Sequence, residues 1–298
     1  MRTRLLIDAK NLLWRAQSAM GELADSEGNL TGAIHGFLLT LLRVREYASS
    51  ARVIICWDDW DGGPAKRREI YSAYKKKDEP PDLERIEVAQ QVWKQQEGLM
   101  EFLSQINVLQ CRSLGWEADD VMGTLAKRYS AKGGKVFIFS GDRDLLQCVS
   151  ANVTVLRPGF KGQVSVETPV TVLEKFGVPV EKFVDYKAFV GDIGDNIPGC
   201  KGVGPKGAAA ILKSERGVQE AVYRAKVDPE WKYSKFLLKG GDEALLSYRL
   251  ATIVRDVPLE WVPRRLDFAE AKKFLAKRKL TTLLMKWQEL KRLGGGLK

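Results

Sequence analysis

Histidine is almost absent from this sequence, and cysteine is sparse. His35 is the single histidine in 298 residues, and the four cysteines are scattered without a CxxC pair. The usual zinc-binding spacings are therefore excluded, and catalysis that depends on histidine is disfavoured. We interpret His35, within the apolar stretch 33–44, as a packing residue and the cysteines as small core or surface residues. The cysteines are Cys56, Cys111, Cys148 and Cys200.

Long hydrophobic runs are also missing. No apolar run approaches the roughly 20 residues that span a bilayer, so we expect no membrane partner. The apolar run at residues 5–7 is too short for a signal peptide and leads into a strand pattern. With 45% hydrophobic and 29% charged residues, the chain has the composition of a globular protein. These features predict a cytoplasmic protein.

Positive charge exceeds negative charge. Lysine and arginine number 48 against 38 aspartates and glutamates, which gives a formal net charge of +10 and a pI near 9.3. Such an excess favours polyanionic partners, although solubility alone could account for it. The positions of the charges are therefore more informative than their total.

Three short apolar runs are each followed by aspartate. Such runs are typical of buried parallel strands, and strands that alternate with helices place their carboxyl ends at one edge of a sheet. Ligands of open α/β sheets bind beyond that edge. We therefore expect these aspartates to meet there. Asp8 follows residues 4–7, Asp58 follows residues 52–57, and Asp142 and Asp144 follow residues 136–139.

More carboxylates stand at the start of a predicted helix within residues 115–132. They are Glu117, Asp119 and Asp120. Acidic residues in a first helical turn can simply satisfy free backbone N–H groups and oppose the helix dipole. Their order along the chain also places this helix start beside the strand-end aspartates, so both interpretations stay open.

A cluster of this many carboxylates requires cations. Two bare carboxylates 4 Å apart repel each other by roughly 4 kcal/mol at an effective dielectric constant of about 20. Because histidine and cysteine are scarce, hard ions that prefer oxygen ligands, Mg²⁺ or Mn²⁺, are the natural choice.

Two segments indicate contact with nucleic acid. Residues 64–77 are rich in lysine and arginine and contain Tyr71 and Tyr74, a combination that suits a phosphate backbone with unstacked bases, although most charge runs are solvated faces. Residues 202–208 read GVGPKGA, the form of a helix-hairpin-helix clamp, in which glycines let backbone N–H groups approach a phosphate. A glycine-rich turn without this pattern would be weak evidence.

Several motifs follow one another along nearly the whole chain. They are LLID (5–8), WD (57–58), RREIYSAYK (67–75), GWEADD (115–120), SGDRDLLQ (140–147), VGDIGDNIPGCKGVGPKGAA (190–209) and SYRLATIVRDVPL (247–259). In this order they resemble the 5′-nuclease family, which includes flap endonucleases, phage 5′-3′ exonucleases and the N-terminal nuclease domain of bacterial DNA polymerase I. The length, without a polymerase, is most similar to the phage or small bacterial forms.

The resemblance implies an α/β fold with a mainly parallel central sheet flanked by helices, as in PIN-like 5′-nuclease cores. It implies a nuclease core at residues 1–182 with a basic helical arch at 64–106. A helical DNA-binding subdomain follows at 183–298, with its helix-three-turn-helix, the helix-hairpin-helix-like motif, at 187–213. The implied protein is a monomer in the cytoplasm, or in the host cytoplasm if it is phage-encoded.

The implied activity is that of a structure-specific 5′ nuclease, both flap endonuclease and 5′-3′ exonuclease, acting in replication or repair, such as flap or primer removal. Its partner is DNA with a 5′ flap, a nick or a free 5′ end. Its cofactors are two or more Mg²⁺ or Mn²⁺ ions, with K⁺ at the helix-three-turn-helix as in many relatives.

The resemblance also assigns residues, position by position. One metal group comprises Asp8, Asp58, Glu117, Asp119 and Asp120, and a second comprises Asp142, Asp144, Asp192 and Asp195, the last two on the resemblance alone. Arg67, Lys75 and Asp120 are assigned to catalysis. The DNA-binding set is Arg67, Tyr74, Lys75, Lys76, Lys201, Gly202, Gly204 and Lys206.

Departures from the family pattern lie near the second strand end and in the arch. We interpret Asp59 and Asp61 as solvated rather than as supports for a metal ligand. Lys75 is followed by two lysines and then two acidic residues at 76–79, so no further arch arginine is assigned.

Two other functions remain open. One is an RNase H-like 5′ ribonuclease on RNA–DNA hybrids; the glycine-rich segment 190–209 counts against the small toxin-type nucleases, which lack such a clamp. The other is a DNA-binding module that kept the fold without catalysis. Its expected sign is lost carboxylates, and none is missing here.

Overall fold

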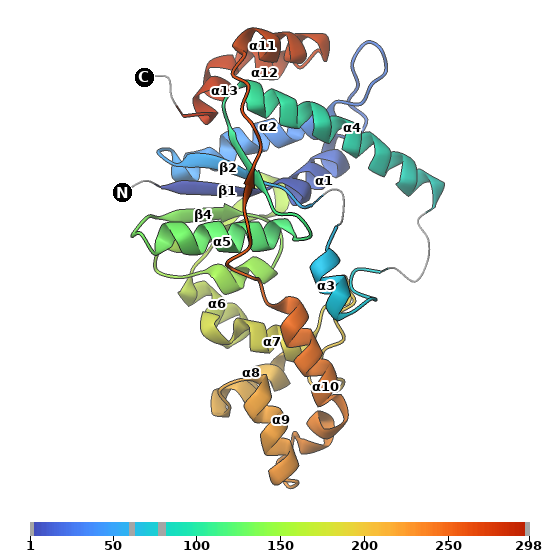
Figure 1. The fold of residues 1–298 in the computed structure, drawn as a ribbon, viewed down its shortest axis with the longest axis vertical. Helices are drawn as coiled ribbons and strands as arrows, with labels where there is room; N and C mark the ends of the chain where they lie inside the picture. Colours follow the sequence, from blue (N-terminus) through green and yellow to red (C-terminus); the bar gives the residue numbers. More distant parts are fainter. Residues whose placement is uncertain (1–2, 60–62, 77–81, 296–298) are drawn as a thin grey trace.

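The computed structural model describes residues 3–59, 63–76 and 82–295. Figure 1 shows a sheet in the middle of an elongated molecule, with helices on both faces and a group of helices extending below it. Within the described residues the sheet has seven strands in the order β6-β5-β4-β1-β2-β3-β7. They are β1 (Arg4–Asp8), β2 (Arg52–Cys56), β3 (Leu109–Arg112), β4 (Val136–Phe139), β5 (Val153–Pro158), β6 (Val164–Glu167) and β7 (Glu260–Trp261).

Strands and helices alternate through the first half of the chain, and the strands from β5 to β3 in the sheet order are parallel. β6 and β7 are antiparallel edges. The helices are α1 (Ala9–Met20), α2 (Gly32–Arg45), α3 (Ala65–Ile70), α4 (Leu83–Gln105), α5 (Ala118–Ser130), α6 (Pro169–Phe176), α7 (Phe183–Val190), α8 (Pro205–Ser214), α9 (Val218–Val227), α10 (Ser234–Ala251), α11 (Phe268–Lys277), α12 (Thr281–Met285) and α13 (Trp287–Leu293). Short 3₁₀ helices are η1 (Glu46–Ala48), η2 (Asp144–Cys148), η3 (Phe160–Gly162) and η4 (Val180–Lys182).

The central strands are apolar on both faces because each face carries its own core. In β1, Leu6 packs into the core beneath α5, whereas Leu5 and Ile7 pack into the core beneath α1 and α2. This alternation follows from the two-residue period of a strand. All three side chains are fully buried. A continuous apolar run is therefore what a strand covered on both faces needs.

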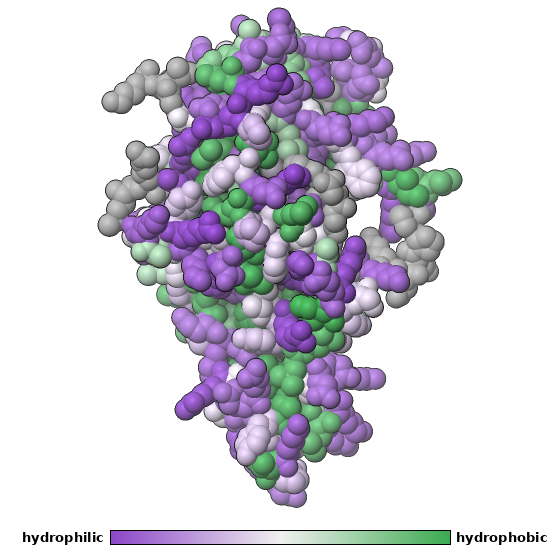
Figure 2. All heavy atoms as spheres, viewed as in Figure 1, coloured by the Kyte–Doolittle hydropathy of each residue, from purple (hydrophilic) through white to green (hydrophobic). Residues whose placement is uncertain are grey.

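The helices after η4 form two separate groups. Helices α7 to α10 extend below the sheet in Figure 1, and their core is continuous with that under α5. The chain then runs back along the sheet edge through β7. Helices α11 to α13 lie at the opposite end of the molecule, where Leu275, Leu283 and Leu290 join the core of α2 and α4. The space-filling view in Figure 2 shows the same elongated outline, with hydrophilic residues over much of this face.

The predicted fold class is confirmed, with a mostly parallel sheet flanked by helices and a helical second unit. The boundary between 182 and 183 stays a prediction. From residue 260 onward, however, the chain packs on the nuclease core. Among the described helices, α7 to α10 are therefore the ones that extend away from it.

Strand β3 was not expected from the sequence, because LQCR alternates polar and apolar residues. Gln110 is nevertheless 1% exposed: its Oε1 accepts the indole N–H of Trp57 at 3.0 Å, and its Nε2 donates to the Met100 carbonyl at 2.9 Å. A polar side chain with both groups bonded can occupy a core position.

Residues 64–106, the predicted arch, contain α3 and α4, which flank residues 77–81; the arch itself stays a prediction. Residues 77–81, and Asp61, lie outside the described part of the chain. In the part that is described, no helix combines the length and apolar character needed to cross a membrane.

Candidate active site

A cleft of 580 Å³ opens at the carboxyl ends of β1, β2 and β4. It brings together Asp8, Asp58 and Asp142 from the strand ends with the start of α5, as the strand pattern predicted, whereas Asp144 does not line it. Lys75 reaches the same cleft from the basic segment. The acidic lining residues are Asp8, Asp58, Glu117, Asp119 and Asp142.

Asp8 is held rigidly at the end of β1. One carboxylate oxygen accepts the backbone N–H of Asn11 at 3.1 Å, which caps α1, and the other accepts the Ser140 hydroxyl at 2.6 Å. Burial and the nearby charge of Asp58 raise the pKa of Asp8 to about 7. Its negative charge is therefore poorly compensated by the protein alone.

Asp119 and Asp58 face the same space. Burial, followed by the charges of Asp142 and Asp8, raises the pKa of Asp119 well above its usual value. Asp58 accepts the backbone N–H of Ala118 at 2.9 Å and lies 3.4 Å from the Lys10 ammonium. Carboxylates that repel one another in this way would gain from a shared cation.

Two members of the second predicted group, Asp144 and Asp192, contact a lysine that sequence reasoning missed. The Lys187 ammonium on α7 lies 2.6 Å from Asp144 Oδ1 and 2.7 Å from Asp192 Oδ2. Burial raises the pKa of Asp144 to about 6, although Lys187 opposes the shift. A signal existed in the sequence, because Lys187 is the one lysine within the apolar helix FVDYKAFV.

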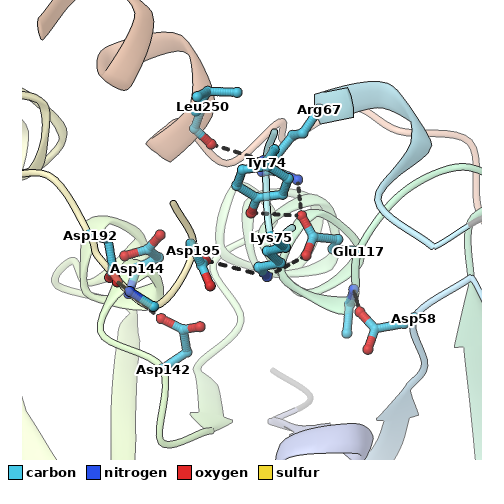
Figure 3. A network of polar contacts seen from close by, with 12 residues as sticks. Asp58, Arg67, Tyr74, Lys75, Glu117, Asp142, Asp144, Asp192, Asp195 and Leu250 are labelled. Atoms are coloured by element: carbon cyan, nitrogen blue, oxygen red, sulfur yellow. Dashed lines mark hydrogen bonds and ion pairs between the residues drawn. The ribbon is translucent and has the colours of Figure 1, made fainter. Parts of the chain in front are cut away.

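Lys75 bridges the two groups, as Figure 3 shows. Its ammonium lies 2.5 Å from Glu117 Oε1 and 3.4 Å from Asp195 Oδ2. Its backbone has a positive φ of 53°, and its N–H donates to the Asp195 carbonyl at 2.9 Å. This location agrees with a catalytic cation, and that role stays a prediction.

Arg67 and Asp120 form a buried pair away from the cleft opening. The guanidinium donates to both Asp120 oxygens at 2.6 and 2.8 Å, and to Glu117 at 2.9 Å. Its remaining N–H groups donate to the carbonyls of Leu250 and Thr252. Since arginine has five N–H donors, none is left for a phosphate.

Both oxygens of Asp120 are likewise occupied. Besides Arg67, they accept the backbone N–H groups of Val254 and Glu117, and the side chain is 0% exposed. The metal and catalytic roles predicted for Asp120, and the catalytic and DNA-binding roles predicted for Arg67, stay predictions. In the described conformation the pair holds Glu117.

Tyr74 also differs from its prediction as a DNA contact. Its ring is 3% exposed and packs with Ile197 and Leu250, and its hydroxyl donates to Glu117 Oε2 at 3.1 Å. A buried ring cannot stack on a base, so the described conformation does not favour the predicted DNA-binding role, which stays a prediction. Glu117 is thereby contacted by Arg67, Tyr74 and Lys75, and these partners hold its pKa below the usual value against the effect of burial.

The other predicted DNA-binding residues are exposed. Lys201, Gly202, Gly204 and Lys206 lie at or just before the start of α8, and Lys76, which follows Lys75, is also exposed. Gly202 has a φ of 91°, and a Cβ atom there would overlap the Phe236 ring. The open surface at this helix start is available to a partner.

Asp59 is not solvated, so that interpretation is wrong. It is 3% exposed and accepts the backbone N–H of Gly115 at 2.7 Å. It therefore holds the loop that leads into α5.

The carboxylates form a donor set made entirely of oxygen, which suits Mg²⁺ or Mn²⁺. Among the described residues, no three histidine, cysteine or acidic side chains are already arranged as a metal cage. Lys75 and Lys187 stand between carboxylates instead. The carboxylate oxygens are thus suitable ligands for divalent ions. In the described conformation the ammonium groups of the two lysines balance part of the negative charge of these carboxylates.

Comparison with known proteins places both units in one family. Residues 3–177 match the description "5'-3' exonuclease, N-terminal resolvase-like domain", and residues 178–274 match "5'-3' exonuclease, C-terminal SAM fold".

Individual relatives agree. A 5'-3' exonuclease of Aquifex aeolicus is 34% identical over 291 residues, covering 96% of this chain and 93% of that protein. DNA polymerase I of Caldicellulosiruptor bescii is 35% identical over 259 residues, but this chain matches only 29% of its length. A flap endonuclease of bacteriophage T5, solved as a pseudo-enzyme–product complex with DNA and metal ions, has a TM-score of 0.70 at 19% identity, covering 99% of this chain and 100% of that one. The predicted family is confirmed: the chain belongs to the 5'-3' exonuclease family.

Proposed function

We propose that this chain is a structure-specific 5′ nuclease that hydrolyses DNA phosphodiesters with divalent metal ions. The observation that carries the proposal is the placement of two carboxylate groups on either side of Lys75 at the sheet edge (Figure 3). The T5 flap endonuclease of the same fold, solved with DNA and metal ions, supports it.

Two sets of residues would hold the ions. The first is Asp8, Asp58, Glu117 and Asp119, and the second is Asp142, Asp144, Asp192 and Asp195. We propose Mg²⁺ or Mn²⁺ because every donor is a carboxylate oxygen. When bound, such ions lower the pKa of the attacking water and stabilise charge on the phosphate and the leaving oxygen.

The protein's own cations have separate tasks. Lys75 points into the cleft, so its ammonium can reach a phosphate oxygen as negative charge develops there. Lys187 is buried between Asp144 and Asp192 and holds both carboxylates in place. Arg67 and Tyr74 keep Glu117 oriented toward Lys75.

The start of α8 would hold the DNA duplex. The N–H groups of its first turn after Pro205 have no side-chain cap, and together with the exposed Lys201 and Lys206 they suit a phosphate backbone. We propose K⁺ as a further ion at this hairpin.

The proposed substrates are DNA with a 5′ flap, a nick or a free 5′ end. We propose that the protein binds them as a monomer in the cytoplasm.

One experiment tests this function. End-labelled 5′-flap, nicked, blunt and RNA-primed duplexes are incubated with Mg²⁺, with Mn²⁺ or with EDTA, and the products are sized. We expect cleavage near the 5′ end only with a divalent ion. Preference for the RNA-primed duplex would favour the ribonuclease alternative, and the absence of any metal-dependent cleavage would favour the non-catalytic module.

A further inference from the structure

The chain returns from the lower helices to the nuclease core through residues 250–257, here called the return segment. It comprises the end of α10 and the residues that follow, which belong to neither a helix nor a strand. Leu250, Ile253 and Val257 of this segment are nevertheless at most 3% exposed. The backbone N–H and C=O groups of a buried segment outside regular structure must be hydrogen-bonded in some other way.

Side chains of the core provide these hydrogen bonds. Gln147 of η2 is 5% exposed; its Nε2 donates to the Ala251 carbonyl at 2.9 Å, and its Oε1 accepts the Ile253 N–H at 2.9 Å. Asp120 of α5 accepts the N–H of Val254 at 2.9 Å. The amide of Gln147 thus bonds to the return segment with both its donor and its acceptor, as the backbone of a neighbouring strand would.

The return segment also packs tightly against α5. A Cβ atom at Gly123 would lie 2.5 Å from Ile253 Cγ2, which is closer than two carbon atoms can pack. One residue further along α5, the Thr124 hydroxyl accepts the N–H of Val257 at 3.1 Å. The absence of a side chain at Gly123 therefore allows the segment to lie in this position on the core.

The elements that hold the return segment also carry carboxylates of the proposed metal groups. Gln147 shares the short helix η2 with Asp144. Arg67 donates both to the Leu250 carbonyl at 2.9 Å and to Glu117 at 2.9 Å, as Figure 3 shows. The position of the return segment is therefore fixed relative to these carboxylates.

At its other end the return segment is continuous with α10, on which the hairpin before α8 rests. The Ser247 hydroxyl of α10 accepts the backbone N–H of Gly199 at 2.9 Å. A Cβ atom at Gly240 of α10 would lie only 3.2 Å from the backbone nitrogen of Lys201. The hairpin and α10 therefore form one packed unit, and the return segment connects that unit to the core.

We infer that Gln147 and Gly123 are positioning residues, which fix the return segment and so set the distance between the DNA-holding hairpin and the carboxylates. Successive phosphates of one strand are about 3.4 Å apart along the axis of a duplex. A shift of a few ångströms between hairpin and cleft would therefore bring a different phosphodiester to the metal ions. This inference rests on the proposed function and specifies how that function selects the bond that is cut.

The test maps the cleavage position on a 5′-flap duplex labelled at its 5′ end. Saturating protein and Mg²⁺ give a single turnover, and the products are resolved to one nucleotide. The wild-type protein should give one dominant product. Gln147→Leu removes both amide groups at similar volume, so its products should spread over neighbouring positions, and its rate should fall by about 10²-fold, as a misplacement of about 1 Å can cause. Duplex affinity in EDTA should not change, because the hairpin is intact.

Two further variants separate positioning from general damage. Gly123→Ala keeps every polar group and suits a helix, but its methyl group displaces Ile253, so its products should spread in the same way. Gln95→Leu is the matched control. Gln95 is 4% exposed and accepts the N–H groups of Ala33 and Ile34, far from the return segment in the chain. Its loss should lower stability and leave the cleavage position unchanged.

Hydrogen exchange followed by mass spectrometry reports the return segment directly. Residues 250–257 should exchange faster in Gln147→Leu than in Gln95→Leu or the wild type. Unchanged exchange in Gln147→Leu, or a wild-type cleavage position in both Gln147→Leu and Gly123→Ala, would overturn the inference. An equal spread of products in Gln95→Leu would also overturn it, because the effect would then follow from lost stability.

Failure of the proposed function gives a different result. If the wild-type protein cleaves no duplex with Mg²⁺ or Mn²⁺, the nuclease function fails and this inference fails with it. A wild-type protein that cleaves the flap duplex at several positions equally would overturn the inference alone.

Discussion

At the scale of single residues, burial separates cations that the sequence groups together. Arg67, Lys75 and Lys76 share one basic segment, yet Arg67 is 6% exposed and fully hydrogen-bonded, Lys75 reaches the cleft, and Lys76 is exposed. A charge can assist chemistry only where its donors are free to move to the substrate. Lys75 is therefore the cation of this segment that we assign to catalysis.

Lys75→Ala should lower kcat by about 10²- to 10³-fold, the usual effect of removing one donor to a developing negative charge. Binding to the same duplex in EDTA should change little. Single-turnover cleavage and anisotropy measure the two effects. Lys76→Ala is the matched control: loss of this predicted DNA contact can weaken binding, but at saturating protein the variant should cleave at the wild-type rate. Equal losses of cleavage rate in both variants would contradict the assignment.

Asp120→Asn should act through stability. Replacing the carboxylate leaves the buried Arg67 guanidinium without its charged partner, and breaking a buried pair costs about 3–5 kcal/mol of unfolding free energy. Urea denaturation measures this loss. If the Asp120→Asn variant has normal stability but does not cleave DNA, Asp120 returns to the metal ligands.

His35 should make the protein less stable in mild acid. Both ring nitrogens are buried without a hydrogen-bond partner among the described residues, and burial lowers the pKa of His35. The unfolded chain then binds the proton more readily, so stability is lost as pH falls through about 6.5.

Because His35 is the single histidine, its ring signals in an NMR titration report this pKa directly. The pH dependence of unfolding between about 8 and 5.5 should be shallower in His35→Phe. Identical slopes, or a ring pKa at or above the usual value of about 6.5, would disprove this account.

At the scale of elements, the start of α5 serves structure and function together. Asp58 accepts the N–H of Ala118, and Asp120 accepts the N–H of Glu117, so carboxylates do cap this helix. Asp119 meanwhile faces Asp8 across the cleft. The capping and the metal-site interpretations of this acidic turn are therefore compatible, because different side chains carry them.

The hairpin before α8 offers a matched pair of glycines. Gly202→Ala places a Cβ against the Phe236 ring at a φ of 91°, so the turn should distort and duplex binding should weaken. At Gly204 the φ is −86° and a Cβ meets nothing within 4 Å, so Gly204→Ala should fold normally.

Thermal unfolding and duplex affinity distinguish these two variants. Gly202→Ala should lower both, while Gly204→Ala should lower only affinity, because its methyl group obstructs a close phosphate. A Gly202→Ala protein with normal stability and affinity would show that the turn tolerates a side chain.

At the scale of the whole molecule, helices α11 to α13 complete the core that α2 and α4 form on one face of the sheet. Leu283 of α12 is fully buried in the core of α2, whereas Met285 of the same helix is 81% exposed. These helices therefore stabilise the nuclease unit, and the helices that we propose for DNA contact are those between η4 and β7.

Leu283→Ala should cost about 2–5 kcal/mol of stability through the cavity it leaves, with little effect on duplex affinity when folded. Met285→Ala is the control and should be neutral. Chemical denaturation compares the two. Equal stability of both variants would mean that α12 does not contribute to the core.

Much of this protein could be read from sequence because the signals are local. Apolar runs ended by Asp8, Asp58 and Asp142 predicted the strands, their parallel arrangement and the acidic edge. The motif order predicted the family, and the glycine-rich segment predicted the exposed hairpin before α8. The two-residue period of a strand and the geometry of a turn depend on residues that are adjacent in the chain, so both can be inferred from the sequence.

Only the tertiary structure decided which charged residues face the cleft. It paired Arg67 with Asp120, buried Tyr74 against Glu117, and placed Lys187 between Asp144 and Asp192. It also returned α11 to α13 to the core. These outcomes depend on burial and on contacts between residues far apart in the chain. Neither can be inferred from the residues that are neighbours in the sequence.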